Sequence, residues 1–229
     1  MATYNIIGDI AGRLDELMLL LTKMPKANKI ILLGDMIDRG PNSKEVIEWA
    51  MTNPDVIAIK GNHEDMMVDF YLKRNRYEQG IWFDNGGSAT VQSYGCMLHT
   101  SKPSYEDKIR ESLNKDHIEW MDKLPMFYED AGLYVSHAPW NGSFALGKYK
   151  SAEDMLWNRY PPHKHEGILQ VFGHNASLKA YHDYAICIDN SSKRVLTGMH
   201  WPTKEIIEQE YLNEIKDGAI REHKAPEDR

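Results

Sequence analysis

The sequence predicts an α/β domain whose functional residues lie at strand ends. Three short apolar runs rich in β-branched residues alternate with segments of helical pattern in the first half of the chain, and each run stops at a glycine followed by a polar side chain. Such alternation is typical of successive strand-to-helix turns in an α/β sheet. Function in open α/β sheets gathers at the carboxyl ends of the strands, so the residues after these glycines are the first candidates for a site.

The first half divides into three strand-and-turn units. Leu14, Leu17, Leu20 and Leu21 keep helical spacing, and Ser43 is predicted to be the N-cap of a second helix. The predicted elements, in chain order, are a strand at 3–8, a helix from Leu14 that ends before Pro25, a strand at 29–33, a helix at 43–51 and a strand at 56–60.

The remainder of the chain is predicted to complete one domain. Residues 65–124 are polar and aromatic with helical patches, so we expect a mostly helical insertion there, with a loop at Asn85-Gly86-Gly87. Residues 1–210 should form the single domain, and 211–229 a charged C-terminal tail. Short strands of a second sheet are expected at 133–136, 168–172, 185–188, 195–198 and 205–207.

Composition excludes several classes of protein. A chain of 229 residues with 42% hydrophobic residues can bury its own core, and Cys96 and Cys187 are too few for a disulfide scaffold, which predicts a reducing cytoplasm. No segment has the apolar length of a membrane helix, and the first nine residues lack a signal-peptide pattern. The formal charge of −7 argues against nucleic acid as the main partner. We expect a monomer, because the sequence shows no apolar stripe that could form an interface.

The chemistry is concentrated in five glycine-containing or histidine-containing motifs. Carboxylate, amide oxygen and imidazole suit manganese, iron or zinc, and a carboxylate can bridge two ions. Two ions about 3.5–4 Å apart would clamp a phosphate and lower the pKa of water, which permits phosphate-ester hydrolysis without a covalent enzyme intermediate. In chain order the motifs are Gly8-Asp9-Ile10-Ala11-Gly12, Gly34-Asp35-Met36-Ile37-Asp38-Arg39-Gly40, Gly61-Asn62-His63-Glu64, Ser136-His137-Ala138 and Gly173-His174-Asn175.

These motifs make the sequence similar to the calcineurin-like metallophosphoesterases of the phosphoprotein phosphatase branch, whose pattern is G-D-x-H-G, G-D-x-x-D-R-G, G-N-H-E, H and G-H. The sequence most resembles the small bacterial and bacteriophage serine/threonine phosphatases, over residues from about 4 to 200. Asn85-Gly86-Gly87 and Trp157-Asn158-Arg159 also resemble segments of that group. The resemblance implies a four-layer α/β/β/α sandwich and a bacterial cytoplasm, or the host cytoplasm for a phage-encoded protein.

The resemblance also implies two divalent metal ions, with manganese as the working choice and iron, zinc or nickel as alternatives. It makes Asp35 the bridging ligand, and it places Asp9 with Asp35 at the first ion. The second ion would be held by Asp35 together with Asn62, His137 and His174.

Four further residues take catalytic roles if the resemblance holds. It makes His63 the general acid that protonates the leaving oxygen, with Asp38 orienting the imidazole. It makes Arg39 and Arg159 the groups that grip the phosphate oxygens, because a planar guanidinium offers paired donors to a tetrahedral anion. Glu64 is open to two interpretations, a hydrogen-bonding partner of the site or a purely structural residue.

Ala11 departs from the family pattern, which has histidine at this position. A methyl group cannot coordinate a metal, so the first site keeps only Asp9 and Asp35 as protein ligands. Since losing even an indirect partner of a ligand costs about 10–100-fold in affinity or activity, we expect a weakened first ion and reduced turnover. Ala11 is either an engineered substitution or a natural variant, and the intact remainder of the motifs favours the first.

The leading functional hypothesis is a phosphomonoesterase that acts on phosphoserine and phosphothreonine in proteins, with phosphotyrosine as a further substrate. The alternative is hydrolysis of dinucleoside polyphosphates or other small phosphoanhydrides, which relatives with the same two-metal core perform. A third hypothesis, suggested by Ala11, is a phosphate- or phosphopeptide-binding protein without turnover. A nucleic-acid phosphodiesterase is disfavoured, because the sequence has no basic stripe with interleaved aromatic residues.

Overall fold

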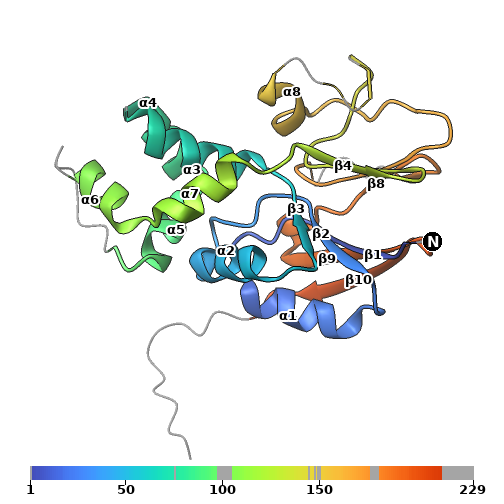
Figure 1. Cartoon of the computed structure of the whole chain (residues 1–229), viewed down its shortest axis with the longest axis horizontal. Helices are drawn as coiled ribbons and strands as arrows, with labels where there is room; N and C mark the ends of the chain where they lie inside the picture. The colour runs from blue at the N-terminus through green and yellow to red at the C-terminus, as the bar shows by residue number, and fades with distance from the viewer. Residues whose placement is uncertain are drawn as a thin grey trace, which may run out of the picture.

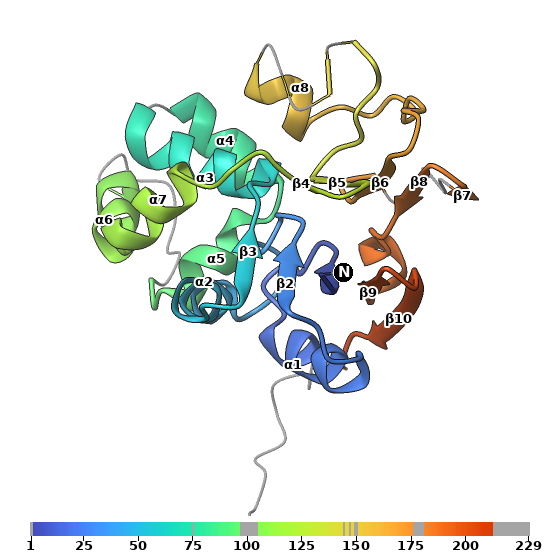
Figure 2. The ribbon, with the colours of Figure 1, turned by 45° about the vertical axis from the view of Figure 1, so that its right-hand side comes forward.

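Two five-stranded sheets pack face to face in this computed structural model (Figure 1, Figure 2). The strand order is β10-β9-β1-β2-β3 in the first sheet and β4-β5-β6-β8-β7 in the second. The structure describes residues 2–74, 76–96, 105–143, 145–146, 148, 151–175 and 181–212. Residues 213–229 of the predicted charged tail lie outside this part of the chain.

The first sheet has a parallel half and an antiparallel half. Its parallel strands β1 (Tyr4–Ile7), β2 (Lys29–Leu32) and β3 (Val56–Ala58) confirm the three strands predicted in the first half of the chain. Strands β9 (Val195–Trp201) and β10 (Glu205–Glu210) form an antiparallel pair, and β9 pairs with β1. The prediction that these two belong to the second sheet was wrong, because pairing across about 190 residues leaves no local signal in the sequence.

The second sheet combines three parallel strands with an antiparallel strand at each edge. Strands β5 (Leu133–Ser136), β6 (Leu169–Phe172) and β8 (Ala185–Cys187) are parallel and lie where the sequence predicts strands. The edge strands β4 (Phe127–Asp130) and β7 (Tyr181–His182) were not predicted. Strand β4 ends in two acidic residues and β7 has only two residues, so neither shows the apolar alternation of a strand.

The core between the sheets is aliphatic, and helices cover the outer faces. Helices α1 (Leu14–Lys23) and α2 (Ser43–Thr52) pack on the first sheet, and the short α8 (Ala152–Leu156) packs beside Tyr134 on the second. The predicted α/β fold with two sheets and flanking helices is confirmed. The buried residues between the sheets are Tyr4, Ile6, Ile31, Leu33, Ile59, Leu133, Val135, Leu169, Val171, Ile188 and Met199.

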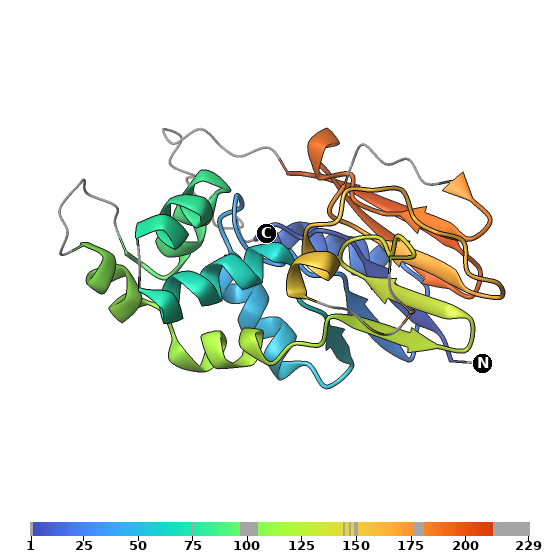
Figure 3. The same cartoon turned by 90° about the horizontal axis from the view of Figure 1, so that it is seen from above.

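The described chain between β3 and β4 is helical, and its five helices gather at one end of the sheets (Figure 3). They are α3 (Asn62–Lys73), α4 (Arg76–Asp84), α5 (Gly87–Ser93), α6 (Tyr105–Ser112) and α7 (Lys115–Asp122). The loop predicted at Asn85-Gly86-Gly87 is shorter than expected, because α5 begins at Gly87. A Cβ there would lie 2.6 Å from the Trp82 ring, so glycine lets the two helices approach closely.

Ser43 does not cap α2, contrary to the sequence prediction. The N-cap is Asn42, and Ser43 is the first residue of the helix and fully buried. Its Oγ accepts a hydrogen bond from the backbone N–H of Asp38 at 3.0 Å and lies 2.9 Å from Oγ1 of Thr90. Ser43 therefore joins α2 to α5 below the loop that carries Asp38.

Candidate active site

The predicted metal ligands follow directly on the strands of both sheets. They lie one to four residues after the strand ends, and all of them are buried. Since β1, β2 and β3 are parallel to one another, as are β5 and β6, the ligands meet at the carboxyl edges of the two packed sheets. The residues in question are Asp9 after β1, Asp35 after β2, Asn62 after β3, His137 after β5 and His174 after β6.

Four polar atoms from both sheets converge on one point. Oδ1 of Asn62 lies 2.8 Å from Nε2 of His137 and 3.0 Å from Nδ1 of His174, and Oδ1 of Asp35 lies 3.3 Å from the same Nε2 of His137. The Nδ1 of His137 lies 2.9 Å from the carbonyl oxygen of Leu33, which can only accept, so Nδ1 carries the proton and Nε2 of the neutral ring carries a lone pair.

A cation bound among these atoms would remove the repulsion between their lone pairs. Nε2 of His137 and the two oxygens of Asp35 and Asn62 repel one another unless a positive charge lies among them, and imidazole with carboxylate and amide oxygen is a donor set that binds transition metals. Burial lowers the pKa of His174 to about 3, which keeps its ring neutral and able to bind a metal. The donor set therefore fits a divalent ion at Asp35, Asn62, His137 and His174.

Asp9 lies beside this cluster. Its Oδ1 accepts a hydrogen bond of 3.3 Å from the backbone N–H of His174, and a Cβ at Gly173 would lie only 2.2 Å from that oxygen. Burial, then the carboxylates of Asp189 and Asp35, raise the pKa of Asp9 well above its usual range.

Ala11 contributes only backbone to the site. Its N–H donates to the carbonyl of Asp35 at 2.8 Å, its own carbonyl accepts from Gly40 at 2.9 Å, and its methyl group is buried. The first ion would therefore have Asp9 and Asp35 from the predicted ligand set, without an imidazole.

His63, Asp38 and Arg39 form a connected group next to Asp35. Nδ1 of His63 lies 2.5 Å from Oδ2 of Asp38, and the Arg39 guanidinium lies 3.0 Å from Nε2 of the same ring. Burial lowers the pKa of His63, but Asp35 and Asp38 outweigh both burial and Arg39, so the pKa is raised overall. The ring can therefore hold a proton close to Asp35, whose Oδ2 lies 3.7 Å from Nε2.

Asp38 is held by two residues that the sequence analysis did not identify. The indole N–H of Trp82 donates to both carboxylate oxygens of Asp38 at 3.1 Å, and Oγ1 of Thr90 donates to Oδ1 at 2.5 Å. Both residues come from the helices α4 and α5, and both are fully buried. No motif marks them in the sequence, because their spacing from Asp38 depends on how these helices pack.

Glu64 joins the loops after β2 and β3. Its carboxylate accepts three backbone hydrogen bonds, from Asp35 at 2.9 Å, Met36 at 2.8 Å and Gly61 at 2.8 Å. Burial, then the charge of Asp35, raise the pKa of Glu64 to about 7. Of the two interpretations left open above, the geometry supports a hydrogen-bonding role that fixes the backbone of the ligand loops.

Replacing Glu64 with glutamine is expected to destabilise the fold by about 3 kcal/mol, because a glutamine amide offers one acceptor oxygen where the carboxylate offers two, and buried N–H groups lose their partners. Urea unfolding of Glu64→Gln followed by circular dichroism measures the change. The matched control is Glu48→Gln, a half-exposed glutamate on α2, for which we expect a change within about 0.5 kcal/mol. Equal stability of the two variants would contradict this role for Glu64.

Five non-glycine residues of the site adopt left-handed backbone conformations. Positive φ is uncommon for side chains other than glycine and costs on the order of 1 kcal/mol or more at each position. Their concentration at the ligand loops is a feature of functional sites, where the surrounding structure holds an unfavourable backbone in place. The residues are Ala11 (φ 51°), Asp35 (φ 47°), Asp38 (φ 71°), Arg39 (φ 64°) and His174 (φ 62°).

Arg159 lies at the rim of the site. Its side chain is exposed, its charge is among the causes that lower the pKa of His174, and its carbonyl accepts a hydrogen bond from Asn175 at 3.4 Å. The Trp157 ring contacts the His174 ring edge-on at 5.9 Å, and Tyr160 beyond Arg159 is 73% exposed. The segment therefore brings a cation close to the cluster of predicted ligands, and an exposed aromatic residue follows it in the chain.

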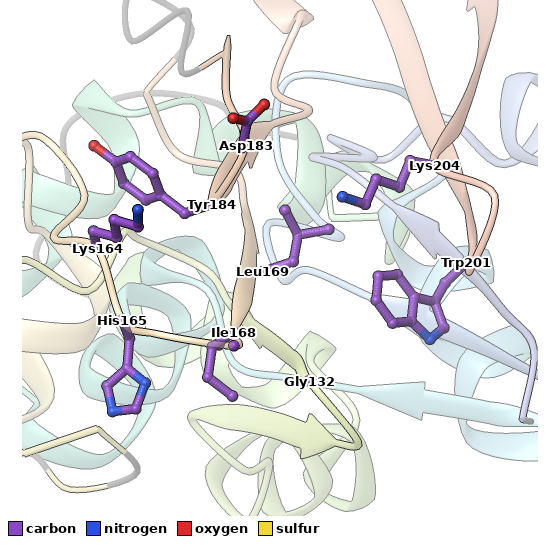
Figure 4. Close-up of a pocket in the computed structure, with 10 residues that line it drawn as sticks. Gly132, Lys164, His165, Ile168, Leu169, Asp183, Tyr184, Trp201 and Lys204 are labelled. Carbon is purple, nitrogen blue, oxygen red and sulfur yellow. The ribbon is translucent and has the colours of Figure 1, made fainter.

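A separate cavity of about 260 Å³ opens at the other end of the second sheet (Figure 4). Gly132 and Leu169 lie at the amino-terminal ends of β5 and β6, whereas the ligands follow the carboxyl ends. Lys164 and Lys204 extend toward the middle of the cavity from opposite sides. This position separates it from the metal cluster, so we do not assign it to the reaction.

The comparisons with known proteins agree with this geometry. A family model described as calcineurin-like phosphoesterase matches residues 3–188, which is most of the chain. The chain belongs to the calcineurin-like phosphoesterase family. This confirms the resemblance stated from the motifs, and membership of the family implies divalent metal ions.

Relatives in this family are named as tetraphosphatases. The chain is 27% identical over 161 residues to the asymmetrical bis(5'-nucleosyl)-tetraphosphatase PrpE of Anoxybacillus flavithermus, with 63% of this chain and 60% of the relative covered. It is 29% identical over 191 residues to the symmetrical bis(5'-nucleosyl)-tetraphosphatase of Buchnera aphidicola, with 79% of this chain and 59% of the relative covered. The chain thus spans about three fifths of the length of these curated relatives.

Solved structures show the same fold. The chain is similar to the structure of a proposed diadenosine tetraphosphatase, with a TM-score of 0.66, 16% identity and coverage of 93% of this chain and 95% of the other. It is also similar to a protein serine/threonine phosphatase from Saccharomyces cerevisiae, with a TM-score of 0.62, 11% identity and coverage of 94% and 82%. At these identities the likeness concerns the fold alone.

Proposed function

We propose that this phosphoesterase uses two divalent ions to hydrolyse a phosphate ester or anhydride. The observation that carries the proposal is the convergence of the His137 Nε2 lone pair with oxygens of Asp35 and Asn62. Asp35, Asn62, His137 and His174 would hold one ion, and Asp9 with Asp35 the other. Two such ions, for which manganese is our choice, would neutralise phosphate charge and lower the pKa of a water nucleophile.

The neighbouring side chains supply the proton and the phosphate contacts. We assign to His63 the protonation of the leaving oxygen from Nε2, while Asp38 holds Nδ1 and fixes the ring orientation. Arg39 would leave Nε2 and donate to the phosphate oxygens once a substrate is bound. Arg159, exposed at the rim, would contact the same phosphate or the next one along a polyphosphate chain.

Dinucleoside polyphosphates are the substrate class that we favour. The exposed Tyr160 next to Arg159 offers an aromatic face for a nucleobase beside a cation for its phosphates. The names of the relatives from Anoxybacillus and Buchnera support this choice over the phosphoprotein hypothesis. It differs from the leading hypothesis drawn from the sequence, which was phosphoserine and phosphothreonine.

Phosphoserine and phosphothreonine remain the second candidate, with phosphotyrosine as a further substrate. The observation that favours them is that both arginines, Arg39 and Arg159, are exposed, so a phosphate on a protein surface can reach them.

Hydrolysis of diadenosine tetraphosphate and of a phosphoserine peptide, each with manganese and with a chelator, separates the candidates. We expect a higher kcat/KM for the dinucleotide. A higher kcat/KM for the phosphoserine peptide would favour the phosphoprotein as substrate. If neither is hydrolysed in a manganese-dependent way, the hypothesis of phosphate binding without turnover is the one supported.

Removing the Tyr160 ring is expected to affect the dinucleotide alone. In Tyr160→Ala the KM for diadenosine tetraphosphate should rise about 5–100-fold, since stacking on one base contributes about 1–3 kcal/mol. Hydrolysis of p-nitrophenyl phosphate, whose small ring is held mainly by its phosphate, should change little. Tyr77→Ala is the matched control, because Tyr77 is equally exposed, at 74%, on α4. An unchanged KM in Tyr160→Ala would contradict the stacking of a nucleobase on this ring.

The setting of the reaction is proposed from the sequence. We propose a reducing cytoplasm because the chain has only two cysteines, and a monomer because the formal charge is −7 and the sequence shows no apolar interaction stripe. Among the described helices, none is long and apolar enough to cross a membrane.

A further inference from the structure

We propose that Asn158 is a positioning residue, which holds the Arg159 guanidinium where it binds the substrate phosphate. This inference rests on the proposed function, in which Arg159 contacts phosphate, and extends it to a buried neighbour that does not itself touch the substrate. It predicts that phosphate affinity depends on the hydrogen bonds of the Asn158 amide, whereas the binding of the metal ions does not.

The Asn158 side chain ties the segment after α8 to the loop after β5. Asn158 is 8% exposed, and its Nδ2 donates a hydrogen bond of 2.5 Å to the carbonyl oxygen of Pro139. Pro139 lies two residues after His137, a proposed ligand of the second ion. The Asn158 amide therefore fixes the position of this segment relative to a ligand loop.

The other end of the amide shapes the turn that carries Arg159. Oδ1 of Asn158 accepts hydrogen bonds from the backbone N–H of Tyr160 at 3.1 Å and from Nδ2 of Asn141 at 3.2 Å. An asparagine that accepts from the N–H two residues further on closes a turn around the residue between them, which here is Arg159. An amide can serve this donor and the Pro139 carbonyl together, whereas a carboxylate has no proton to donate.

A second contact holds the same turn from the loop after β6. Nδ2 of Asn175 donates to the Arg159 carbonyl oxygen at 3.4 Å, and Asn175 directly follows the proposed ligand His174. The Trp157 ring contacts the His174 ring edge-on, with 5.9 Å between the ring centroids. The backbone at Arg159 is therefore held by the loops that follow β5 and β6.

The Arg159 side chain is exposed, and within the described part of the chain its guanidinium makes no hydrogen bond or ion pair. Its charge is therefore available to an external anion. A backbone that is already held in the binding conformation loses less conformational freedom when the phosphate binds. Releasing the turn should therefore weaken phosphate binding even though Arg159 itself is unchanged.

Two measurements with saturating manganese test the inference. One is the KM for p-nitrophenyl phosphate, and the other is the Kd of inorganic phosphate from isothermal titration calorimetry, which does not depend on turnover. The variants are Asn158→Ala, Asn158→Ser, Arg159→Ala and the double variant of Asn158→Ala with Arg159→Ala. In Asn158→Ser the shorter side chain keeps an oxygen for the Tyr160 N–H but loses the donor to Pro139.

Asn114→Ala is the matched control. Oδ1 of Asn114 accepts the same kind of hydrogen bond, from the backbone N–H of Asp116 two residues further on, at 2.9 Å. Asn114 is exposed at the start of α7, and its printed bonds involve no residue of the site. We expect its KM and phosphate Kd to equal those of the unmodified chain.

In Asn158→Ala we expect the KM and the phosphate Kd to rise about tenfold, and in Arg159→Ala about 10–100-fold, since a hydrogen bond to a charged group contributes on this order. Asn158→Ser should lie between Asn158→Ala and the unmodified chain. The kcat should change by less than about threefold, and the manganese content should stay the same. In the Arg159→Ala background, Asn158→Ala should cause no further rise, because no guanidinium is left to position.

Other results would overturn the inference. Unchanged KM and phosphate Kd in Asn158→Ala would refute it, and so would a full further rise in the Arg159→Ala background, which would show that Asn158 acts on the fold or on the metal loops. Circular dichroism checks the fold of each variant, and Asn158→Ser with its own double variant carries the same comparison if Asn158→Ala does not fold.

Failure of the inference can be distinguished from failure of the proposed function. Normal phosphate binding in Arg159→Ala would refute both the phosphate contact of Arg159 and its positioning by Asn158, and would leave the two-ion hydrolysis standing. Absence of manganese-dependent turnover and of phosphate binding in the unmodified chain would refute the proposed function itself.

Discussion

Changing Asp35 to asparagine is expected to remove both ions and lower phosphoesterase activity by about 10²–10⁴-fold. Asp35 is the proposed ligand shared by the two sites, and the loss of even an indirect partner costs about 10–100-fold for each ion. The asparagine side chain can still accept the 3.1 Å hydrogen bond from the backbone N–H of His63, so the loop should keep its shape. Bound manganese and initial rates on p-nitrophenyl phosphate measure the effect.

The free energy of unfolding separates a lost ligand from a lost fold. Without metal, Asp35→Asn should change the free energy of unfolding by no more than about 1–2 kcal/mol, because the charge of Asp35 repels Asp9 and Glu64 but attracts His63. Asp55→Asn, an exposed aspartate ahead of β3, is the control for both measurements. Full activity with two bound ions in Asp35→Asn would contradict the bridging assignment.

Replacing His63 with asparagine is expected to lower kcat by about 10²–10⁴-fold while two manganese ions remain bound, since general acid catalysis contributes rates of this order. His63 faces Asp35 but belongs to no ligand cluster in the described chain, so metal content should not change. The loss should depend on the leaving group. An alkyl phosphate, whose alkoxide must be protonated, should suffer more than p-nitrophenyl phosphate, whose phenolate leaves readily.

Equal losses on the two substrates would argue against a proton from His63 and for a role in binding phosphate. Asp38→Asn provides a graded comparison, because it keeps the shape of the side chain that holds Nδ1 but removes its charge. We expect a smaller loss of kcat than in His63→Asn and the same dependence on the leaving group. An Asp38→Asn enzyme with unchanged kcat would show that the imidazole needs no orientation by this carboxylate.

The site residues could be predicted because each follows a strand directly. The parallel strands carry the motif residues Asp9, Asp35 and Asn62 to one edge, and a local apolar run suffices to locate each strand. The structure brings these residues together with His137 and His174, as the motifs led us to expect. Their roles remain proposals for the experiments above.

Other parts of the site had no local signal. Trp82 and Thr90 reach Asp38 across 44 and 52 residues of chain, through helices whose packing the sequence pattern does not define.

The assignment of β9 and β10 to the second sheet failed for a related reason. The sequence predicts a strand at 195–198, within the observed β9, but a local pattern carries no information on the partner strand. Here the partner is β1, at the other end of the described chain. The same limit applies to the left-handed backbone at Asp35 and Asp38, which long-range contacts impose against local preference.

The proposed metal ligands are divided between the two sheets, so metal supply should affect the stability of the folded protein. The first sheet supplies Asp9, Asp35 and Asn62, and the second supplies His137 and His174. An ion held by ligands from both sheets would therefore bind only when the two sheets are packed together. At a free concentration one hundred times its Kd, each ion would add about 2.7 kcal/mol to the free energy of unfolding. In a cell short of this metal, the protein would unfold more often and would be more readily degraded by proteases.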